Sequence, residues 1–138
     1  MTLQYSVTLR NNQLDQVETT VGASAKLQIR SGAAPANCAA ADSGTLLCEI
    51  ALPSDWMAAA SSGSKAKSGT WSGTGEVGAG SGTAAGHFRI KDSAGTVTHL
   101  QGSITITGGG GDMTLDNTSI AQNQSVVVNT FSISAGNA

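Results

Sequence analysis

Residues 87–107 read HFRIKDSAGTVTHLQGSITIT, and this stretch carries the strongest hairpin signal in the chain. Two runs rich in β-branched and aromatic residues, His87–Lys91 and Thr96–Thr107, flank the sequence Asp92-Ser93-Ala94-Gly95. Asp and Gly favour tight turns, and a turn between two such runs is typical of two paired antiparallel strands. The centre of the chain is therefore predicted to be a β-hairpin.

Further strands are predicted on both sides of this hairpin, because short apolar or alternating runs are separated there by Gly, Pro and Ser. The predicted strands are residues 25–30, 45–52, 65–71, 112–115 and 125–133. The inward-facing side chains are expected to include Leu27, Ile29, Ala66, Val126, Val128 and Ile133. Residues 31–43 and 108–111 are predicted loops, residues 73–82 a loop or a poorly packed edge strand, and residues 55–60 a short helical stretch.

The N-terminal segment carries two overlapping patterns. Leu3, Tyr5, Val7 and Leu9 alternate as in a strand, but apolar positions continuing to Val21 are spaced by three and four as in a helix. Gly22 is suited to end such a helix. A helix over about residues 8–21 is therefore predicted, with strands from about residue 25 to residue 134.

These elements together predict the fold class. The chain is expected to be mainly β: a single-domain antiparallel β-sandwich or jelly-roll-like barrel over residues 1–138, with an N-terminal helix. A length of 138 residues suits one domain. Strands and helices do not alternate along the chain, so a doubly wound parallel sheet is not expected.

Composition and charge exclude several partners. Charged residues make up 12% of the chain and the net charge is −2, with seven scattered Lys and Arg residues. Nucleic acid is not an expected partner, because a phosphate-tracking surface needs a dense basic stripe. No apolar run approaches the ~18 residues of a membrane span, and no secretory signal is evident. Cys38 and Cys48 are expected to be free thiols in a reducing cytosol.

No motif in the chain supports catalysis or cofactor binding. Gly73-x-Gly75-x-x-Gly78 matches a dinucleotide fingerprint, but no helix-forming stretch follows it. Numerous serines lack a partner base at a recognisable spacing. The chain is therefore expected to be no enzyme, with no cofactor, no metal and no small-molecule substrate.

Two pairs of titratable residues are predicted to be structural. In the hairpin register expected from a four-residue loop, Phe88 faces His99, which places His99 partly buried and His87 at the solvent or a contact. Asp112 and Asp116 flank a predicted strand, but calcium needs six to eight oxygen ligands from a wrapping loop. They are predicted to be exposed acids at the strand ends.

Aromatic residues are scarce, at 4% of the chain, so each one matters to a core or an interface. Trp56, Met57 and Trp71 lie next to predicted turns and loops. Core packing is as probable for them as a contact role, and only for Trp56 is the contact role slightly favoured. Together with Tyr5, they are the candidate interface residues.

Several stretches resemble small proteins of tailed bacteriophages and prophages. They are LPSDWMAAA (52–60), SKAKSGTW (64–71), GHFRIKDSAGT (86–96), GDMTLDN (111–117) and the C-terminal SISAGNA (132–138). The chain most resembles head decoration, or cement, proteins, such as those on the heads of Bordetella phages. These motifs concern packing and turns, so no functional residue is carried over.

The resemblance implies a jelly-roll-like β domain that associates with itself, most simply as a homodimer. Such a protein would be made in the bacterial host cytoplasm and would bridge major capsid protein subunits on the capsid exterior of the virion. The alternative expectation is a phage tail or receptor-binding β module that recognises a host surface ligand. Aromatic platforms with adjacent carboxylates or amides would favour this alternative.

Overall fold

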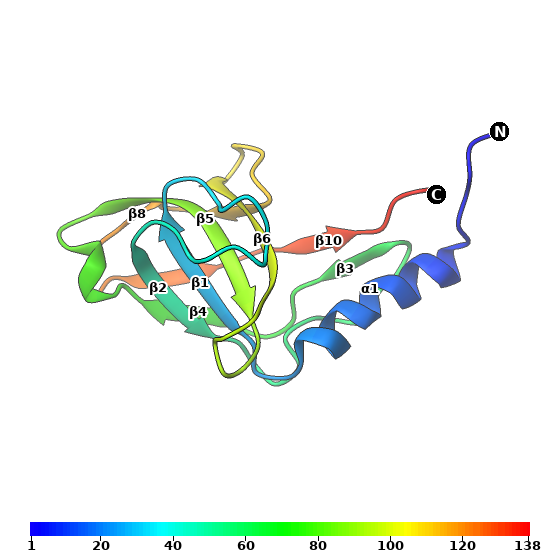
Figure 1. The fold of residues 1–138 in the computed structure, drawn as a ribbon, viewed down its shortest axis with the longest axis horizontal. Coiled ribbons are helices and arrows are strands. Elements are labelled where there is room, and N and C mark those ends of the chain that lie inside the picture. Colours follow the sequence, from blue (N-terminus) through cyan, green and yellow to red (C-terminus); the bar gives the residue numbers. More distant parts are fainter.

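The computed structural model describes residues 1–138 and is mainly β with one N-terminal helix, as the sequence predicts. Figure 1 shows a curled sheet with the helix extending from it. The elements are α1 (Val7–Val21), β1 (Lys26–Ser31), β2 (Leu46–Ala51), β3 (Ser64–Ala66), β4 (Trp71–Thr74), the 3₁₀ helix η1 (Val77–Ala79), β5 (Thr83–Lys91), β6 (Thr98–Ile106), β7 (Met113–Leu115), β8 (Ser119–Ile120), β9 (Ser125–Val128) and β10 (Ser132–Ser134).

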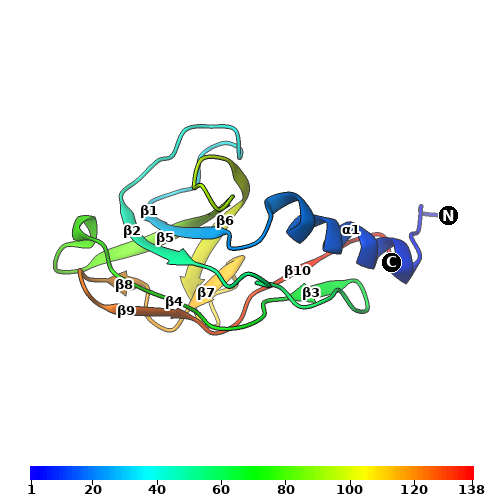
Figure 2. The same cartoon turned by 90° about the horizontal axis from the view of Figure 1, so that it is seen from below.

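The main sheet has the strand order β2-β1-β5-β6-β7, and β8 pairs with the first residues of β5. Beyond β2, the separate pair β4-β9 continues the curvature through a bridge between Cys48 and Gly75 and a hydrogen bond from Glu76 N to Leu47 O. The result is a half-barrel that encloses the core (Figure 2). This arrangement agrees with the predicted sandwich or barrel class.

One strand pair departs from the predicted antiparallel pattern. β7 runs parallel to β6, with Ile104 opposite Met113. Parallel neighbours are usually joined by about a dozen residues or more. Here only residues 107–112 connect them, and Gly108 and Gly110 have φ angles of 88° and 82°. Glycine adopts this backbone conformation without strain, so the short loop can return the chain to the start of a parallel strand.

The predicted hairpin is present as β5 and β6, but its register differs from the expected one. Ile90 pairs with Leu100 and Phe88 with Gly102, whereas the four-residue loop had placed Val97 and His99 opposite them. A register shift lies between Ile90 and Lys91, whose partners on β6 are two residues apart. The turn already places Lys91 opposite Thr98 rather than Thr96, and the bulge, in which His99 is the extra residue, displaces every pairing beyond it further.

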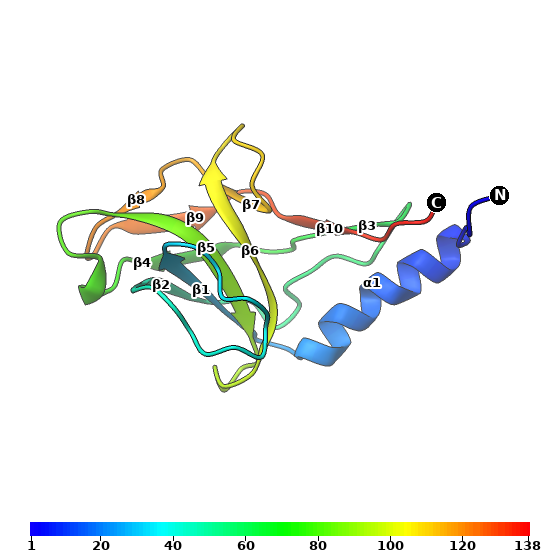
Figure 3. The same ribbon diagram turned by 45° about the horizontal axis from the view of Figure 1, so that its top comes forward.

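Helix α1 begins and ends close to the predicted bounds. The side chain of Ser6 accepts a hydrogen bond from Leu9 N at the start, and Gly22, with φ 93°, donates its N–H to Glu18 O at the end. Together, α1, β3 and β10 form an arm that projects from the half-barrel, and both chain termini lie at its far end (Figures 1 and 3).

Three predictions between residues 55 and 133 were wrong in detail. Residues 55–60 form no helix, because Ala58 N bonds to Ala66 O and Met57 bridges Lys67 in extended backbone. Residues 65–71 contribute to two strands, and Lys65 points inward in place of Ala66, since it meets carboxylates of α1. Residues 125–133 likewise divide into β9 and β10.

Most of the predicted core is confirmed. Leu27, Ile29, Val126 and Val128 are buried, and Ile133 packs half-buried against the same cluster. The remaining buried apolar side chains come from every layer of the half-barrel and from its junction with the arm. Burial of a Val, Leu, Ile, Phe or Met side chain contributes about 1.5–3 kcal/mol, so this cluster is the main source of stability.

Candidate interaction surface

Three of the four predicted interface residues lie in the core. Trp56, Met57 and Trp71 are all at least 99% buried. Trp56 Nε1 donates a hydrogen bond to Gly22 O at 2.9 Å, and Trp71 Nε1 donates to Ser68 O at 3.1 Å. The contact role favoured for Trp56 is therefore wrong. Its position beside a turn is covered because the half-barrel and the arm join there.

An aromatic chain runs through this junction. The ring centroids of Trp56 and Trp71 are 6.1 Å apart, and Phe131 lies 5.6 Å from both Trp71 and Phe88. These separations fall within the range of favourable tilted and edge-to-face packing. Since Phe88 belongs to β5 and Phe131 precedes β10, this row of aromatic rings fixes the arm to the half-barrel.

Polar contacts hold α1 against the β3 side of the arm. Lys65 Nζ lies 2.8 Å from Asp15 Oδ1 and 3.3 Å from Glu18 Oε2. The two carboxylates also accept backbone N–H groups, Asp15 from Ala60 and Glu18 from Met57. Hydrogen bonding to Lys65 and then to Ala60 lowers the pKa of Asp15. Sequence patterning marked these acids only as helix residues, because their cation is distant in the chain.

The outer end of the arm carries exposed apolar side chains. Met1 is fully exposed, Leu3 is 67% exposed, and Val7 and Leu9 are each nearly half exposed. Tyr5 lies among them and is partly exposed. We call these five residues the N-terminal apolar patch. Tyr5 is thus the one predicted interface residue that lies on an accessible apolar segment.

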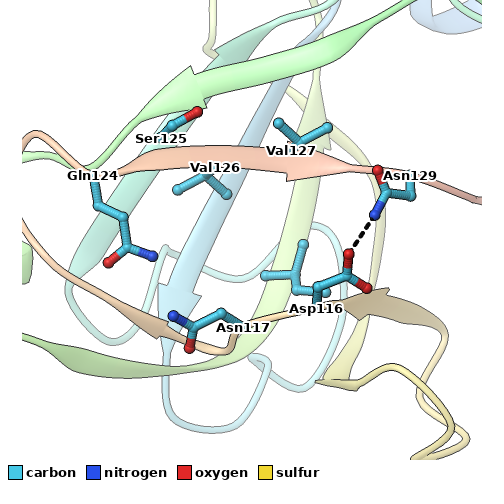
Figure 4. Close-up of a pocket in the computed structure, with 8 residues that line it drawn as sticks. Asp116, Asn117, Gln124, Ser125, Val126, Val127 and Asn129 are labelled. Carbon is cyan, nitrogen blue, oxygen red and sulfur yellow. Dashed lines mark hydrogen bonds between the residues drawn. The ribbon is translucent and has the colours of Figure 1, made fainter.

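A polar pocket of about 330 Å³ lies where β9 faces the segment after β7 (Figure 4). Asp116 accepts hydrogen bonds from Asn129 Nδ2 at 2.7 Å and Thr107 Oγ1 at 2.8 Å. Asn117 and Gln124 also line the pocket, together with three aliphatic side chains. No aromatic ring and no paired base and nucleophile are among its lining residues. The pocket can therefore offer hydrogen bonds to a ligand.

A cationic cluster surrounds Asp42 on the outer face of the main sheet. Arg30, Arg89 and Lys91 all donate to its carboxylate, at 3.1, 2.6 and 2.6 Å. Burial opposes ionisation of Asp42, but the hydrogen bond from Lys91 and the charge of Arg30 outweigh it and lower the pKa. Arg89 also donates to the carbonyls of Cys38 and Ala40. The cluster therefore anchors the loop between β1 and β2.

One of the two histidines departs from the prediction. His87 is completely buried, and its Nδ1 lies 2.8 Å from Gly32 O, so its expected solvent-facing position was wrong. His87 lies on the face of β5 opposite the core residue Phe88, and the loop between β1 and β2 covers that face. His99 is half-buried, as expected. No group of three or more His, Cys, Asp or Glu side chains is arranged to hold a metal ion.

Asp112 and Asp116 are exposed acids at the ends of β7, as predicted. Asp112 accepts both the backbone N–H and the hydroxyl of Ser103, each at 2.9 Å. The backbone donor, followed by the hydroxyl, lowers the pKa of the Asp112 carboxyl. Asp112 therefore accepts the backbone N–H of Ser103, which lies on the edge of β6 just before the residues that pair with β7.

Both cysteines are free thiols, as expected. Cys48 is buried, and its burial, with the charges of Glu76 and Glu49, raises the pKa to about 11. Cys38 lies half-buried in the loop between β1 and β2. No helix is long and apolar enough to cross a membrane.

Comparisons of the chain with protein-family models, with curated proteins and with solved structures gave no match. The functional interpretation therefore depends on the residues and surfaces described above.

Proposed function

We propose that this chain is a non-enzymatic virion structural protein. It acts as a capsid cement, or decoration, protein that binds major capsid protein subunits on the outer surface of a phage head and also binds itself. It is made in the bacterial host cytoplasm and resides on the capsid exterior. The observation that carries the proposal is the N-terminal apolar patch at the end of a projecting arm.

The arrangement of the arm favours a binding role. Single exposed apolar residues are normal on protein surfaces, but exposed apolar groups that occur together mark contact sites. Here Met1, Leu3, Tyr5, Val7 and Leu9 fall within the first nine residues. The aromatic junction and the Lys65 contacts hold this segment at a fixed distance from the half-barrel. An arm of this kind can reach a neighbouring subunit while the half-barrel rests on another.

The stabilising mechanism is mass action. A protein that binds the assembled shell, but not its separate subunits, adds its binding free energy to the stability of the shell. Many copies on a symmetric lattice make modest affinities at single sites sufficient. A low charge suits this role, because an extensive close contact then has few charges to desolvate.

Co-sedimentation of the purified protein with capsid shells that lack it tests the proposal. We expect saturation at a constant ratio to the major capsid protein, and reduced binding by the variant Leu9→Ser. Val77→Ser is the matched control, because Val77 is 75% exposed and lies in η1, which packs against β2 of the half-barrel. Mass spectrometry of virions should give hundreds of copies. Saturation at only a few copies per shell, or equal binding by both variants, would contradict the proposal.

The second candidate is a phage tail or receptor-binding β module that recognises a host surface ligand. The polar pocket in Figure 4 favours it, because amide and carboxylate groups there can bind hydroxyls. The missing aromatic platform places this candidate second. Recovery of the chain with purified tails, together with binding of the protein to host cells, would support it over the cement proposal.

A further inference from the structure

An open groove lies between β6 of the half-barrel and β10 of the arm. Its volume is about 300 Å³, and half of its lining residues are hydrophobic. The hydrophobic ones are Phe88, Leu100, Phe131 and Ile133, and the polar ones are Gln101, Asp112, Ser132 and Ser134. We call this site the β10 groove. Phe88 and Phe131 pack edge to face and belong to the row of aromatic rings that joins the arm to the half-barrel, so the floor of the groove is well packed.

The β10 side of the groove is an unpaired strand edge. β10 pairs only with β3, with Ile133 opposite Lys65. Phe131 O accepts Lys67 N, and Ala135 N donates to Gly63 O, so odd-numbered residues direct their backbone toward the β3 side. Because backbone groups alternate along a strand, Ser132 and Ser134 direct theirs to the open edge. Both residues are exposed.

The β6 side is open in the same way. β7 pairs with β6 only from Ile104 to Ile106. Ser103 N points away from β5, to Asp112, so the backbone of Gln101, two residues earlier, points in the same direction. The side chain of Gln101 turns to the opposite face of the sheet, together with that of its pairing partner Arg89, and donates through Nε2 to Pro35 O at 2.7 Å. Gln101 therefore meets the groove through its backbone.

The chain also contains a strand-patterned segment without a partner strand. Residues 1–6 alternate Met1, Leu3 and Tyr5 with Thr2, Gln4 and Ser6, but they belong to no strand. Ser6 O accepts a hydrogen bond from Arg10 N of the helix, and before Ser6 the backbone makes one hydrogen bond, from Tyr5 N to Asn137 O at 2.6 Å. Gln4 Nε2 also donates to Ala138 O at 3.5 Å. Residues 1–4 thus continue past the end of β10 and away from the groove.

We propose that residues 1–5 of a second copy bind in the β10 groove as an added strand. The unpaired backbone of Ser132, Ser134 and Gln101 would receive main-chain hydrogen bonds, as in other cases of strand addition. Leu3 would cover the apolar floor formed by Phe88, Leu100 and Phe131. The chain's own segment would have to reverse direction and lose the Tyr5–Asn137 bond, so a second copy is the better occupant.

Exchange between two copies would make the same contact twice. A two-fold dimer uses one self-complementary surface on each subunit, and two reciprocal strand additions meet that condition. This inference deepens the self-association in the proposed function. It does not depend on the capsid contact, which is tested separately through Leu9.

Sedimentation equilibrium of the full chain gives the first test. We expect a concentration-dependent dimer whose dissociation constant rises at least tenfold in Leu3→Glu, since a charge would be buried against Phe88 and Phe131. Thr2→Glu is the matched control, because residue 2 alternates to the opposite face, and it should dimerise like the unmodified chain. A monomer at all concentrations, or equal effects of both variants, overturns the inference. A monomer that still saturates capsids would leave the cement proposal intact.

Disulfide trapping identifies the occupant. In a Cys38→Ser background, Leu3→Cys and Ser132→Cys are made as separate variants and mixed under mild oxidation. Cys48 is buried and stays unreactive. We expect a crosslinked heterodimer from the mixture, and none when Ser132→Cys is replaced by Ser93→Cys in the hairpin turn. A variant that carries both Leu3→Cys and Ser132→Cys tests whether the bond can form within one chain. If it does, or if the mixture of single variants gives no crosslink, the second copy is not the occupant.

Discussion

Lys65 and Asp15 form an ion pair across the arm, with Nζ 2.8 Å from Oδ1 and only 3% of the lysine side chain exposed. Lys65 Nζ also donates to Ala58 O at 2.8 Å, and Glu18 lies within 3.3 Å. A buried ammonium needs such partners, because desolvation otherwise disfavours its charge. Lys65 therefore helps to fix the position of α1, together with the backbone N–H groups of Ala60 and Met57 that donate to the same carboxylates.

Replacement of Lys65 by Met should lower the free energy of unfolding by about 1–3 kcal/mol. The aliphatic part is kept, but Ala58 O loses its donor and two carboxylates lose their shared cation. Urea unfolding followed by circular dichroism measures the change. Lys26→Met is the control, since Lys26 pairs with Glu49 at 3.7 Å with both side chains about one-third exposed, and should cost about 0–1 kcal/mol. Equal losses would show that the burial of Lys65 is unimportant.

The stability of the protein should fall in acid below about pH 4. The pKa values of Asp15, Asp42, Asp92 and Asp112 are lowered from 3.8 by hydrogen bonds and by nearby cations. A lowered pKa means that the folded state binds fewer protons than the unfolded state. The resulting stabilisation is full above the unfolded pKa and is lost as pH falls through the folded one. Asp112→Asn should flatten the dependence of the urea midpoint on pH in this range, and an unchanged slope would contradict the assignment.

The contribution of Lys65 to stability should depend on pH in the opposite direction, and should be lost as pH rises. Its pKa is raised above 10.5, because hydrogen bonds to Asp15 and Glu18 and their charges outweigh the lowering by burial. A raised pKa stabilises the folded state at all pH values below 10.5, and this contribution is lost as pH rises through the folded pKa. Thermal unfolding from pH 9 to pH 12 should therefore show a steeper decline for the unmodified chain than for Lys65→Met.

The sequence predicted the helices and strands better than the pairing between strands. Local signals suffice for α1, where Gly22 ends a run of helical spacing, and for the presence of the β5–β6 hairpin. The parallel pairing of β7 and the bulge at His99 could not be predicted, since both depend on which distant strand supplies the next hydrogen bond. Period-two reasoning assumes an uninterrupted register, and one extra residue reverses it.

The candidate interface was harder to predict than the fold. Trp56 and Trp71 are at element ends, which in an isolated strand would be accessible, but the packing of the arm on the half-barrel covers them. Lys65 was predicted to face the solvent because it is charged, but it is buried, since its carboxylate partners lie on α1. The exposed patch was visible in the sequence only as the alternation of Leu3, Tyr5, Val7 and Leu9, which a helix prediction left unexplained.

Reactivity should separate the two cysteines. Cys48 is buried and its pKa is about 11, so it carries almost no thiolate at pH 8, whereas Cys38 is half-buried on a loop. Titration with Ellman's reagent should detect one thiol in the folded protein and two in guanidinium chloride. Cys38→Ser should abolish the fast reaction. Two fast thiols in the folded state would contradict the burial of Cys48, and no thiols in guanidinium would indicate a disulfide.

The glycine content has a structural origin that substitution can expose. A Cβ built at Gly86, in β5, would lie only 2.1 Å from Gly32 O, which is much closer than real Cβ contacts allow. This close approach occurs beside the bulge between β1 and β5, where Gly32 O also contacts buried His87. Gly86→Ala must therefore move backbone in the central strand pair, and it should destabilise the protein by about 1–3 kcal/mol or more.

Gly136 provides the matched control, because a Cβ at that position has no atom within 4 Å and its φ is not positive. Gly136→Ala should change the free energy of unfolding by no more than about 0.5 kcal/mol. Urea unfolding of the two variants in parallel measures the difference. If both behaved alike, the glycines of the sheet would be a compositional feature without a packing role. A loss confined to Gly86→Ala would show that close approach of neighbouring backbones in the half-barrel requires glycine at that position.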